Sequence, residues 1–504
     1  MSGSREQPAP AGTADCDRFR PPTPSEAELK YEPVPPPGPR GPRQHARRHI
    51  PVVPTGPDVP DHLPAAPVQH PGVRAFARIS DPAPDDLVIA QQTLLLAAAD
   101  NGSASQVCEP SLAVNGDVVF MTGNWFAAIS LDGGRTFRYT DPATAFANPP
   151  GMRFCCDQIV HYIEQIDMFV WLLQYMIDEE GKNVQRLAFA TTEDVRRGNW
   201  WTTDITTEGM GIEGSFLDFP DLAVGRNALY MSTNAFRRSA GLFDDFEWAC
   251  SIVIRMPYSG LRSGKIEAET VMSDDNFNFR VAQHCDDRVY WATHADTSTL
   301  RVYSWHESTE SAAFFDVPVS TWMGGNGFLS ETPDGYNWLR RIDPRVLGAA
   351  KAGDILYFAW SVDRGGANER PHPHIQIARV NTLNMLLLEN MSIWDPDAAT
   401  AYPALTSNAA REVGCSYFIG GGNRYPTHAL SLLTRTRKDI IAAEGLRGPT
   451  QQRWGDFVTI RRHYPHTRLF AASGYVLRSG SGEQDATANY TVFGRREDVE
   501  AVTG

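Results

Sequence analysis

The chain has 504 residues, of which 42% are hydrophobic and 21% are charged, as is typical of a globular protein with a substantial core. Its formal net charge is −14 at pH 7. We therefore expect no nucleic-acid partner, because binding of phosphates requires a basic surface. No apolar run reaches the roughly 20 residues of a membrane span, and the longest, residues 168–177, suits a buried strand.

Residues 1–80 differ in composition from the rest of the chain. They contain half of the 36 prolines and few aromatic or β-branched residues. Such a segment buries too little apolar surface to offset the entropy of ordering it, so we predict a disordered arm, partly in polyproline II, that proteases remove. A short basic patch in the arm is interpreted either as a solvated tail or as the binding segment for an acidic protein partner. The patch consists of Arg40, Arg43, His45, Arg47, Arg48 and His49.

From residue 85 onward, short runs of Val, Ile, Tyr, Phe and Trp alternate with Gly, Asn, Asp and Pro, which is typical of β-strands joined by turns. Residues 87–90 are expected to form the first strand, and residues 437–446 the best short helix. Seven segments then repeat one pattern, at spacings of roughly 47 to 63 residues: a polar anchor, a short apolar strand, a turn and an aromatic-rich strand. They begin at Glu109, Asp157, Asp218, Phe279, Ile342, Tyr402 and Trp454.

Each repeat also contains a second pair of strands, and four strands per repeat make a propeller blade. The sequence therefore predicts an all-β protein whose residues 81–504 form a β-propeller behind the disordered arm of residues 1–80. Seven four-stranded blades fit the repeat best, and six blades are the alternative if one blade has been divided in two.

Residues 130–137 read Ser-Leu-Asp-Gly-Gly-Arg-Thr-Phe between two predicted strands. The glycines accept the positive φ of a tight hairpin, and Asp132 is expected to accept hydrogen bonds from backbone N–H groups of its own turn while Phe137 packs under it. The pattern resembles the Asp box, or BNR repeat, of sialidase-like β-propellers. It is carried by Ser130, Asp132, Gly134, Thr136 and Phe137. The resemblance implies a structural role at the edge of a blade, and an ordinary hairpin with an Asp-Gly turn is the alternative.

The innermost strands of a propeller surround a central channel, and the polar anchors should converge at one end of it. Carboxylates and a tyrosine there are candidates for acid–base catalysis. These candidate catalytic residues are Asp157, Asp218, Asp343, Asp456 and Tyr402. The candidate substrate-binding residues are Arg280, Arg341, Arg453 and His161. The alternative is that these side chains satisfy backbone groups of their own loops. For the last repeat we expect Asp456 to face the channel mouth and Trp454 to pack between blades.

The seven cysteines include no Cys-x-x-Cys pair, so we expect buried free thiols and no metal site. The one disulfide considered joins Cys108 to Cys155 or Cys156. No cofactor motif is present, because the glycine-rich run at residues 420–422 follows a strand with no helix behind it.

The resemblance to sialidase-like propellers implies a glycan-directed protein that takes a glycan or another small acidic ligand at the channel mouth. It is either a glycoside hydrolase or a carbohydrate-binding module. The Arg-Ile-Pro motif of sialidases is matched only by Arg78-Ile79-Ser80, so their arginine triad and nucleophile are not carried over, and enzymatic activity stays open. The alternative is a non-catalytic scaffold tethered by its proline-rich arm. The first eight residues lack a signal-peptide core and predict a cytoplasmic protein, whereas the resemblance keeps export open.

Overall fold

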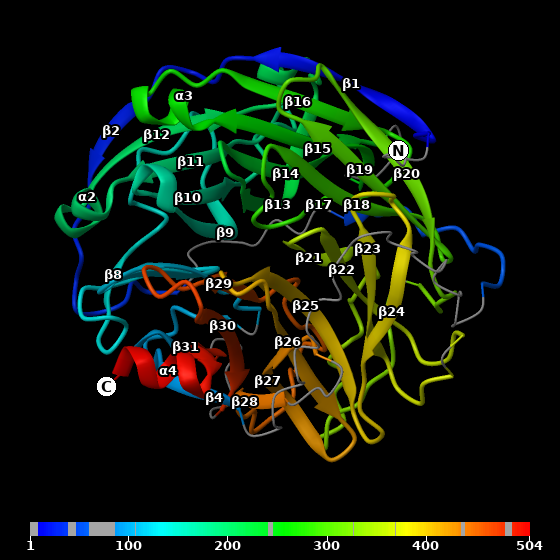
Figure 1. Cartoon of the computed structure of the whole chain (residues 1–504). Helices are drawn as coiled ribbons and strands as arrows, with labels where there is room; N and C mark the ends of the chain where they lie inside the picture. The colour runs from blue at the N-terminus through cyan, green and yellow to red at the C-terminus, as the bar shows by residue number, and fades with distance from the viewer. Residues whose placement is uncertain are drawn as a thin grey trace.

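The computed structural model describes residues 9–38, 47–59, 86–105, 107–239, 245–325, 327–367, 369–434, 439–478 and 486–503. The protein is an all-β propeller, as the sequence predicts (Figure 1). The described strands make up six sheets, which contain seven units of four antiparallel strands; six of the units consist of strands consecutive in sequence. Two of these units are joined by β1 (Gly12–Phe19) into one ten-stranded sheet.

The strands of the first three units are β5 (Ser111–Asn115), β6 (Val118–Gly123), β7 (Phe126–Ser130), β8 (Arg138–Thr140), β9 (Phe154–Ile163), β10 (Met168–Tyr175), β11 (Gln185–Ala190), β12 (Asn199–Ile205), β13 (Ser215–Val224), β14 (Ala228–Arg238), β15 (Asp245–Pro257) and β16 (Ala268–Ser273). Those of the fourth and fifth units are β17 (Arg280–Val281), β18 (Arg288–Asp296), β19 (Thr299–His306), β20 (Ser311–Pro318), β21 (Val346–Ala352), β22 (Ile355–Val362), β23 (His374–Asn381) and β24 (Leu387–Ile393). Those of the last two are β25 (Ala399–Ser407), β26 (Val413–Gly421), β27 (Arg424–Leu432), β28 (Asp439–Ala443), β29 (Thr459–Arg462), β30 (Phe470–Leu477), β31 (Ala486–Arg495) and β4 (Leu87–Leu94).

The first strands of the seven units form a closed ring. Along the chain β5, β9, β13, β17, β21, β25 and β29 each contact the next, and β29 contacts β5. In Figure 1 most of these strands lie toward the centre, while β12, β16 and β24 lie toward the outside. Side chains at the starts of seven strands therefore meet around one channel, as the repeat pattern predicts.

The last unit is closed by a strand from the beginning of the propeller. β4 pairs antiparallel with β31, from Leu87 opposite Arg495 to Leu94 opposite Asn489. Residues 87–90 are thus a strand, as expected, but they occupy the outer edge of the last sheet. Because β4 and β31 are distant in sequence, this pairing holds the two ends of the ring together.

The turn of residues 130–137 is attached to this closure. Asp132 Oδ1 accepts hydrogen bonds from the backbone N–H groups of Arg135 and Thr136, each at 2.9 Å, as the sequence predicts. Burial opposes ionisation of Asp132. Hydrogen bonds from Thr136, Ser130 and the backbone outweigh this effect and lower the pKa of Asp132 to about 2. The Gly134 carbonyl accepts from the Thr93 hydroxyl of β4 at 2.7 Å. The turn therefore links the first unit to the closing strand.

The prediction of a disordered arm differs from the structure over residues 9–38 and 47–59. β1 pairs with β16 and β20, β2 (Ser25–Glu28) pairs with β12, and β3 (Arg47–His49) pairs in parallel with β15. The unpaired edges of outer strands offer backbone N–H and C=O groups that a short extended segment satisfies, so little apolar burial is needed. The remaining residues of the predicted arm, 1–8, 39–46 and 60–80, lie outside the described residues.

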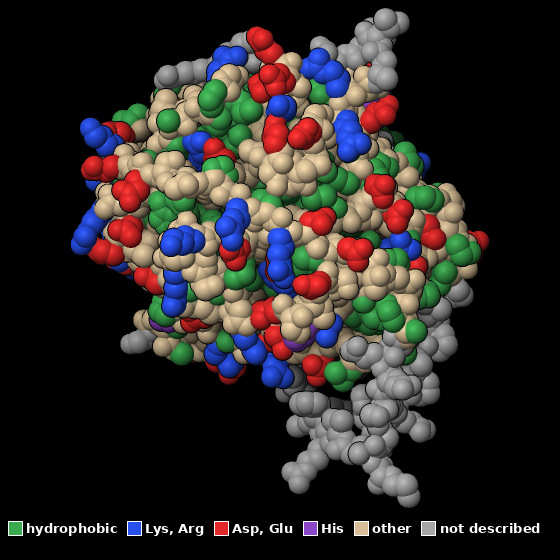
Figure 2. All heavy atoms as spheres, turned by 90° about the horizontal axis from the view of Figure 1, so that it is seen from above, with side chains coloured by type: hydrophobic (Ala, Val, Ile, Leu, Met, Phe, Trp, Pro, Cys, Tyr) green, Lys and Arg blue, Asp and Glu red, His purple; other side chains and the backbone are tan. Residues whose placement is uncertain are grey.

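Helices are short and peripheral: α1 (Leu96–Asp100), α2 (Thr192–Arg197), α3 (Tyr258–Ser263) and α4 (Arg496–Thr503). The predicted helix at residues 437–446 is wrong, because residues 439–443 form β28, whose pairing with β27 outweighs local helix propensity. No helix in the described part of the chain combines the length and hydropathy of a membrane span. On the face drawn in Figure 2, acidic and basic side chains are intermingled.

Candidate functional site

Five carboxylates from five units gather at the end of the channel where the inner strands begin. Four of them, Asp157, Asp218, Asp343 and Asp456, are sequence-predicted candidates, and Glu109 is the fifth. Burial raises the pKa of Asp157 well above its ordinary range, and the charges of Glu109, Asp218 and Asp456 raise it further. The carboxylates therefore act on one another, as expected for groups that share a single mouth.

Glu109 is buried between the first and last units. Its Oε2 accepts a hydrogen bond from Asn124 Nδ2 at 2.8 Å, and its Oε1 accepts one from the backbone N–H of Asp456 at 2.7 Å. Burial raises the pKa of Glu109 to about 7, and the charge of Asp456 adds to this effect while Arg453 opposes it. A carboxyl group with such a pKa keeps its proton near neutral pH, as a general acid must.

Three non-glycine residues at the mouth have positive φ: Glu109 (47°), Phe219 (53°) and Tyr402 (58°). Each precedes a proline: Pro110 comes directly before β5, whereas Pro220 and Pro403 lie inside β13 and β25, where the pairing register shifts. Such backbone conformations are strained and occur preferentially at functional sites. Tyr402 is itself buried, and burial together with the charges of Asp456 and Asp343 raises its pKa well above the usual range.

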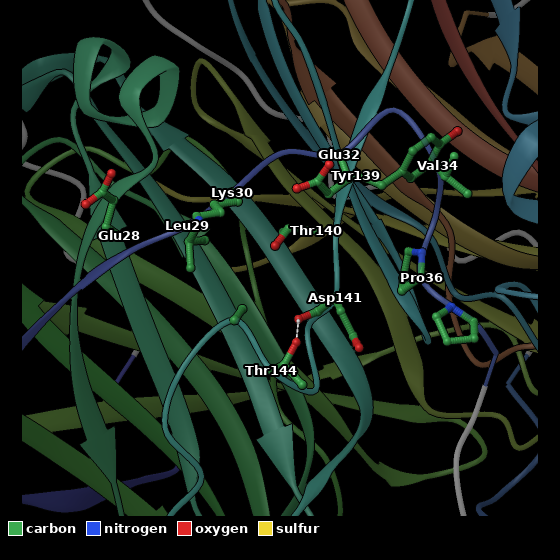
Figure 3. A pocket seen from close by; sticks show the side chains of 12 residues that line it. Glu28, Leu29, Lys30, Glu32, Val34, Pro36, Tyr139, Thr140, Asp141 and Thr144 are labelled. Carbon is green, nitrogen blue, oxygen red and sulfur yellow. Dashed lines mark hydrogen bonds between the residues drawn. The ribbon is translucent and has the colours of Figure 1, made fainter.

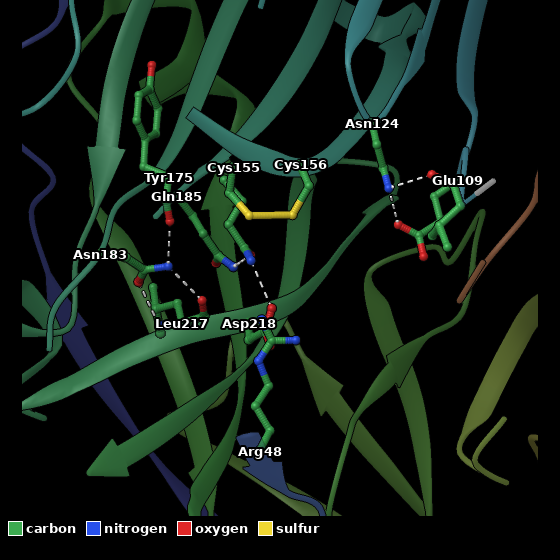
Figure 4. The surroundings of a disulfide bond; sticks show 12 residues. Arg48, Glu109, Asn124, Cys155, Cys156, Tyr175, Asn183, Gln185, Leu217 and Asp218 are labelled. Atoms are coloured by element: carbon green, nitrogen blue, oxygen red, sulfur yellow. Dashed lines mark hydrogen bonds and ion pairs between the residues drawn. A yellow bond between two sulfur atoms is a disulfide. The ribbon is translucent and has the colours of Figure 1, made fainter. Parts of the chain in front are cut away.

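Asp218 is fully buried and is held by two partners. Gln174 Nε2 donates to its Oδ1 at 2.8 Å, and Arg48 Nε lies 2.6 Å from its Oδ2. Figure 4 shows the Arg48 guanidinium directed at Asp218. Arg48 also lies 5.7 Å from the centre of the Phe219 ring. Arg48 of the arm thus brings a positive charge to the mouth. The acidic partner of this one residue of the basic patch is Asp218 of the same chain.

Arg345 joins two of the carboxylates. Its Nη1 lies 2.8 Å from Asp343 Oδ2, and its Nη2 lies 3.5 Å from Asp456 Oδ1. Asp343 and Arg345 are buried, whereas the side chain of Asp456 is 31% exposed. Trp454 is buried and stacks on Tyr475 with ring centres 4.6 Å apart. The burial of Trp454 and the partial exposure of Asp456 are compatible with the positions expected for them, and the catalytic role of Asp456 stays a prediction.

Two further predicted arginines lie at this end of the channel. Arg341 is exposed and Arg453 is half-buried, and neither has a carboxylate within 4 Å among the described residues. Burial lowers the pKa of Arg341, and the nearby charge of Arg453 lowers it further. Two adjacent cations that pair with no carboxylate in the described part of the chain are suited to binding an anionic group.

The structure does not bring Arg280 and His161 to the mouth carboxylates. Arg280 Nη1 lies 3.1 Å from Asp221 Oδ2, farther along the channel. His161 Nε2 lies 2.9 Å from Gln283 Oε1, and burial lowers the pKa of His161 to about 3. A neutral, buried histidine bonded to an amide has a structural role here.

Sequence reasoning missed Glu109, Arg345 and Arg48 as site residues. Glu109 begins a repeat, as the predicted aspartates do, and Arg345 lies two residues after Asp343. The sequence pattern could therefore have identified both as site residues. Arg48 had none, because its position depends on the route of the arm.

The disulfide considered between Cys108 and Cys155 or Cys156 is not formed. Cys155 and Cys156 are bonded to each other on β9, close to Asp218 in Figure 4, and Cys108 is a buried free thiol. Burial raises the pKa of Cys108 well above its ordinary value, which keeps this thiol protonated. The four other cysteines form no disulfide in the described part of the chain; Cys250, Cys285 and Cys415 are buried, as expected, whereas Cys16 is half-buried.

Two cavities are relevant to ligand binding. A cavity of about 20 Å³ beside the mouth is lined by Phe219, Asp221, Arg280, Arg345 and neighbouring residues, which is room for about one water molecule. A larger cavity of about 390 Å³ lies on the periphery, between arm residues 28–37 and residues 139–145 (Figure 3). In the described part of the chain, no group of three or more His, Cys, Asp or Glu side chains is arranged to hold a metal ion.

Stability should depend on the protonation of Glu109. In the folded protein its pKa is about 7, compared with an ordinary value of 4.5. The stabilisation by the bound proton is fully present below the ordinary value and is lost as pH rises toward 7. Glu109→Gln removes this contribution. The free energy of unfolding, measured with urea, should therefore fall between pH 5 and pH 8 by about 3 kcal/mol less in this variant than in the unaltered protein. Exposed Glu310→Gln should leave the decline unchanged, and an unchanged decline in Glu109→Gln would contradict the prediction.

No protein-family model matches the sequence, and comparison with curated proteins also finds no match. Among solved structures, the α-L-arabinofuranosidase Arb93A from Fusarium graminearum is similar with a TM-score of 0.39, 10% identity, and coverage of 78% of this chain and 94% of that chain. Trypanosoma rangeli sialidase is similar with a TM-score of 0.37, 8% identity, and coverage of 68% and 54%. The hemagglutinin-neuraminidase of parainfluenza virus 5 is similar with a TM-score of 0.37, 11% identity, and coverage of 72% and 94%.

Proposed function

We propose that the mouth of the channel binds a glycan that carries an acidic group and hydrolyses one of its glycosidic bonds. One arrangement carries the proposal: the buried carboxyl group of Glu109, whose pKa burial raises to about 7, lies beside the partly exposed carboxylate of Asp456 and near two arginines that have no carboxylate within 4 Å among the described residues. A glycoside hydrolase needs a carboxyl pair of this kind.

The two carboxyl groups have different environments, which suits them to different roles. Glu109 is buried, keeps its proton to about pH 7, and would donate it to the leaving group. Asp456 is partly exposed beside the Arg345 guanidinium and would act as the base or nucleophile. Arg341 and Arg453 would hold the acidic group of the substrate.

The test is a panel of chromogenic glycosides assayed with the full-length protein. Pairs of substrates should share a leaving group and differ in whether the sugar is a carboxylated or a neutral one. We expect turnover of at least one acidic glycoside, and an increase in KM of roughly tenfold in Arg453→Gln, since one charge-assisted bond is worth about 1.5 kcal/mol or more.

Arg226→Gln is the matched control, because Arg226 is exposed but pairs with Asp286 at 2.8 Å, away from the mouth. It should leave KM unchanged. Binding without turnover would reduce the proposal to a carbohydrate-binding module. Neither binding nor turnover across the panel, measured also by calorimetry with the free sugars, would overturn it.

A further inference from the structure

Inner strands of the propeller carry a bulge at the mouth. In β13 and in β25 the antiparallel register shifts near the start of the strand, and each shift leaves one extra residue on the inner strand. The shifted segments contain Phe219-Pro220 and Tyr402-Pro403. Proline fixes its own φ, so the backbone of these two bulges is permanently restrained.

The bulge in β9 is larger and contains no proline. Gln158 pairs with Leu173 of β10, and the next pair along the ladder joins Phe154 to Tyr175. Three residues of β9 therefore lie opposite one residue of β10, where a regular ladder would place one opposite one. The first two of these three residues are the bonded cysteines. A disulfide between adjacent residues closes a small ring that includes their peptide bond, so it restrains this bulge in place of a proline.

The β9 bulge determines the positions of two groups at the mouth. Its third residue is Asp157, whose side chain makes no hydrogen bond or ion pair with the residues that the structure describes, so the backbone alone positions it. The residue opposite the bulge is Gln174, which accepts a hydrogen bond from Gln185 Nε2 at 2.9 Å and donates to Asp218 Oδ1 at 2.8 Å. A change in the shape of the bulge therefore reaches Asp157 directly and Asp218 through Gln174, close to the disulfide in Figure 4.

Small thiols can reach the disulfide. Cys155 and Cys156 are half-buried, whereas four of the five cysteines outside this bond are buried. Attack of a thiolate on one sulfur forms a mixed disulfide and releases the thiolate of the other cysteine, and a second thiol then releases the first cysteine. Two thiols are thereby oxidised to a disulfide, and their two electrons and two protons convert the cysteine pair to two thiols. Exposed disulfides are the ones that undergo this exchange and serve regulation.

We propose that Cys155 and Cys156 are positioning residues for the mouth carboxylates and that their bond is a reversible redox switch, operated by low-molecular-weight thiols. With the bond formed, the ring restrains the bulge and holds Asp157 and Gln174 in place. With the bond reduced, the bulge relaxes, Asp157 loses its fixed position and the contact between Gln174 and Asp218 loosens. The switch is a property of the fold, and only its effect on turnover rests on the proposed function.

The first test asks whether the bond responds to thiols in the folded protein. The full-length protein is incubated in graded mixtures of reduced and oxidised glutathione, thiols are blocked with iodoacetamide, and the blocked cysteines are identified by mass spectrometry. We expect Cys155 and Cys156 to be blocked together in reducing mixtures, and to be protected in samples reoxidised before blocking, with an unchanged circular dichroism spectrum. Blocking in every mixture, or only after unfolding, would overturn the proposal.

The second test measures amide hydrogen exchange in the two redox states and requires no variant. Reduction should speed exchange in peptides that cover residues 154–158 and 173–175 by roughly tenfold, since local opening is no longer restrained by the ring. The proline-restrained bulge of β25 is the internal control and should exchange at an unchanged rate.

A double variant and its matched control extend the second test. Cys155→Ser with Cys156→Ser should exchange at the reduced rate under both conditions. Cys16→Ser removes a half-buried cysteine of β1 that lies outside the disulfide, and this variant should respond to thiols as the unaltered protein does. Equal exchange in both redox states, or a thiol response that persists in the double variant, would overturn the switch.

Turnover separates the switch from the proposed function. For a glycoside that is hydrolysed, reduction should lower kcat/KM by roughly tenfold or more, because a small displacement of reacting groups slows the chemistry, and reoxidation should restore it. Faster exchange with unchanged turnover would overturn the switch, because the mouth would then not depend on the bulge. If no glycoside is hydrolysed, the proposed function fails, and hydrogen exchange alone decides whether the switch exists.

Discussion

Replacing Asp456 with Asn is expected to lower the turnover of an acidic glycoside by at least about 100-fold, the usual effect of losing a catalytic carboxylate. The same change should move the thermal unfolding midpoint very little. The Asp456 side chain is 31% exposed and lies 3.5 Å from Arg345, whose closer partner is Asp343 at 2.8 Å. Asparagine keeps the size and one acceptor oxygen but removes the charge that a base or nucleophile needs. Kinetics with a substrate from the glycoside panel and differential scanning calorimetry measure the two effects.

Asp343→Asn is the matched comparison, because Asp343 contacts the same arginine but is buried. Removing its charge leaves Arg345 poorly compensated, so this variant should unfold several degrees earlier. If Asp456→Asn unfolded several degrees earlier and kept full activity, Asp456 would be a structural residue. The proposed site would then lose its most accessible carboxylate.

A chain that starts at residue 95 is expected not to form a stable propeller, whereas a chain that starts at residue 86 should fold. The shorter chain lacks β4, which pairs with β31 along its whole length and buries Leu87 in the core. Its absence exposes the β31 edge and removes the contacts between Thr93 and the turn of residues 130–137. The loss is comparable with the whole stability of a domain, about 5 to 15 kcal/mol.

Circular dichroism, size-exclusion chromatography and urea unfolding of the two chains check this prediction. The chain from residue 86 controls for removal of β1 and β2, which are added to the outer edges of complete units, and of β3, which pairs with the first residues of β15. It should be monomeric with a cooperative transition at lower urea than the full chain. Equal unfolding midpoints for the two truncated chains would show that β4 contributes nothing to closure.

The propeller and the position of its mouth could be predicted from the sequence because both depend on short-range patterns. An anchor such as Asp218 or Asp456 precedes an apolar strand in every repeat, and strands that begin a repeat must meet at the channel. The hydrogen bonds of Asp132 were equally local, since they link residues of one turn. The chemical roles of the site residues could not be predicted in this way, because they depend on the pKa of Glu109 and on the burial that raises it.

Long-range pairing could not be predicted from composition. Residues 9–38 are rich in proline and polar side chains, yet β1 and β2 satisfy the edges of sheets formed by residues more than 150 positions away. Likewise, nothing local at Arg48 indicates that Asp218 is its partner. Residues 439–443 are a different case, because their partner β27 ends only seven residues earlier, and pairing with it outweighs the local helix propensity.

The closure by β4 also imposes an order on biosynthesis. About 390 residues separate the end of β4 from the start of β31, so at about 5 to 20 residues per second the ribosome needs roughly 20 to 80 s to supply the partner strand. During that time the first strand of the propeller emerges without a neighbour, and its apolar residues 87–90 depend on chaperones for protection. The last sheet can be completed only once β31 has been made, so a chain arrested shortly before that point carries all seven inner strands but lacks the pairing of β4 with β31.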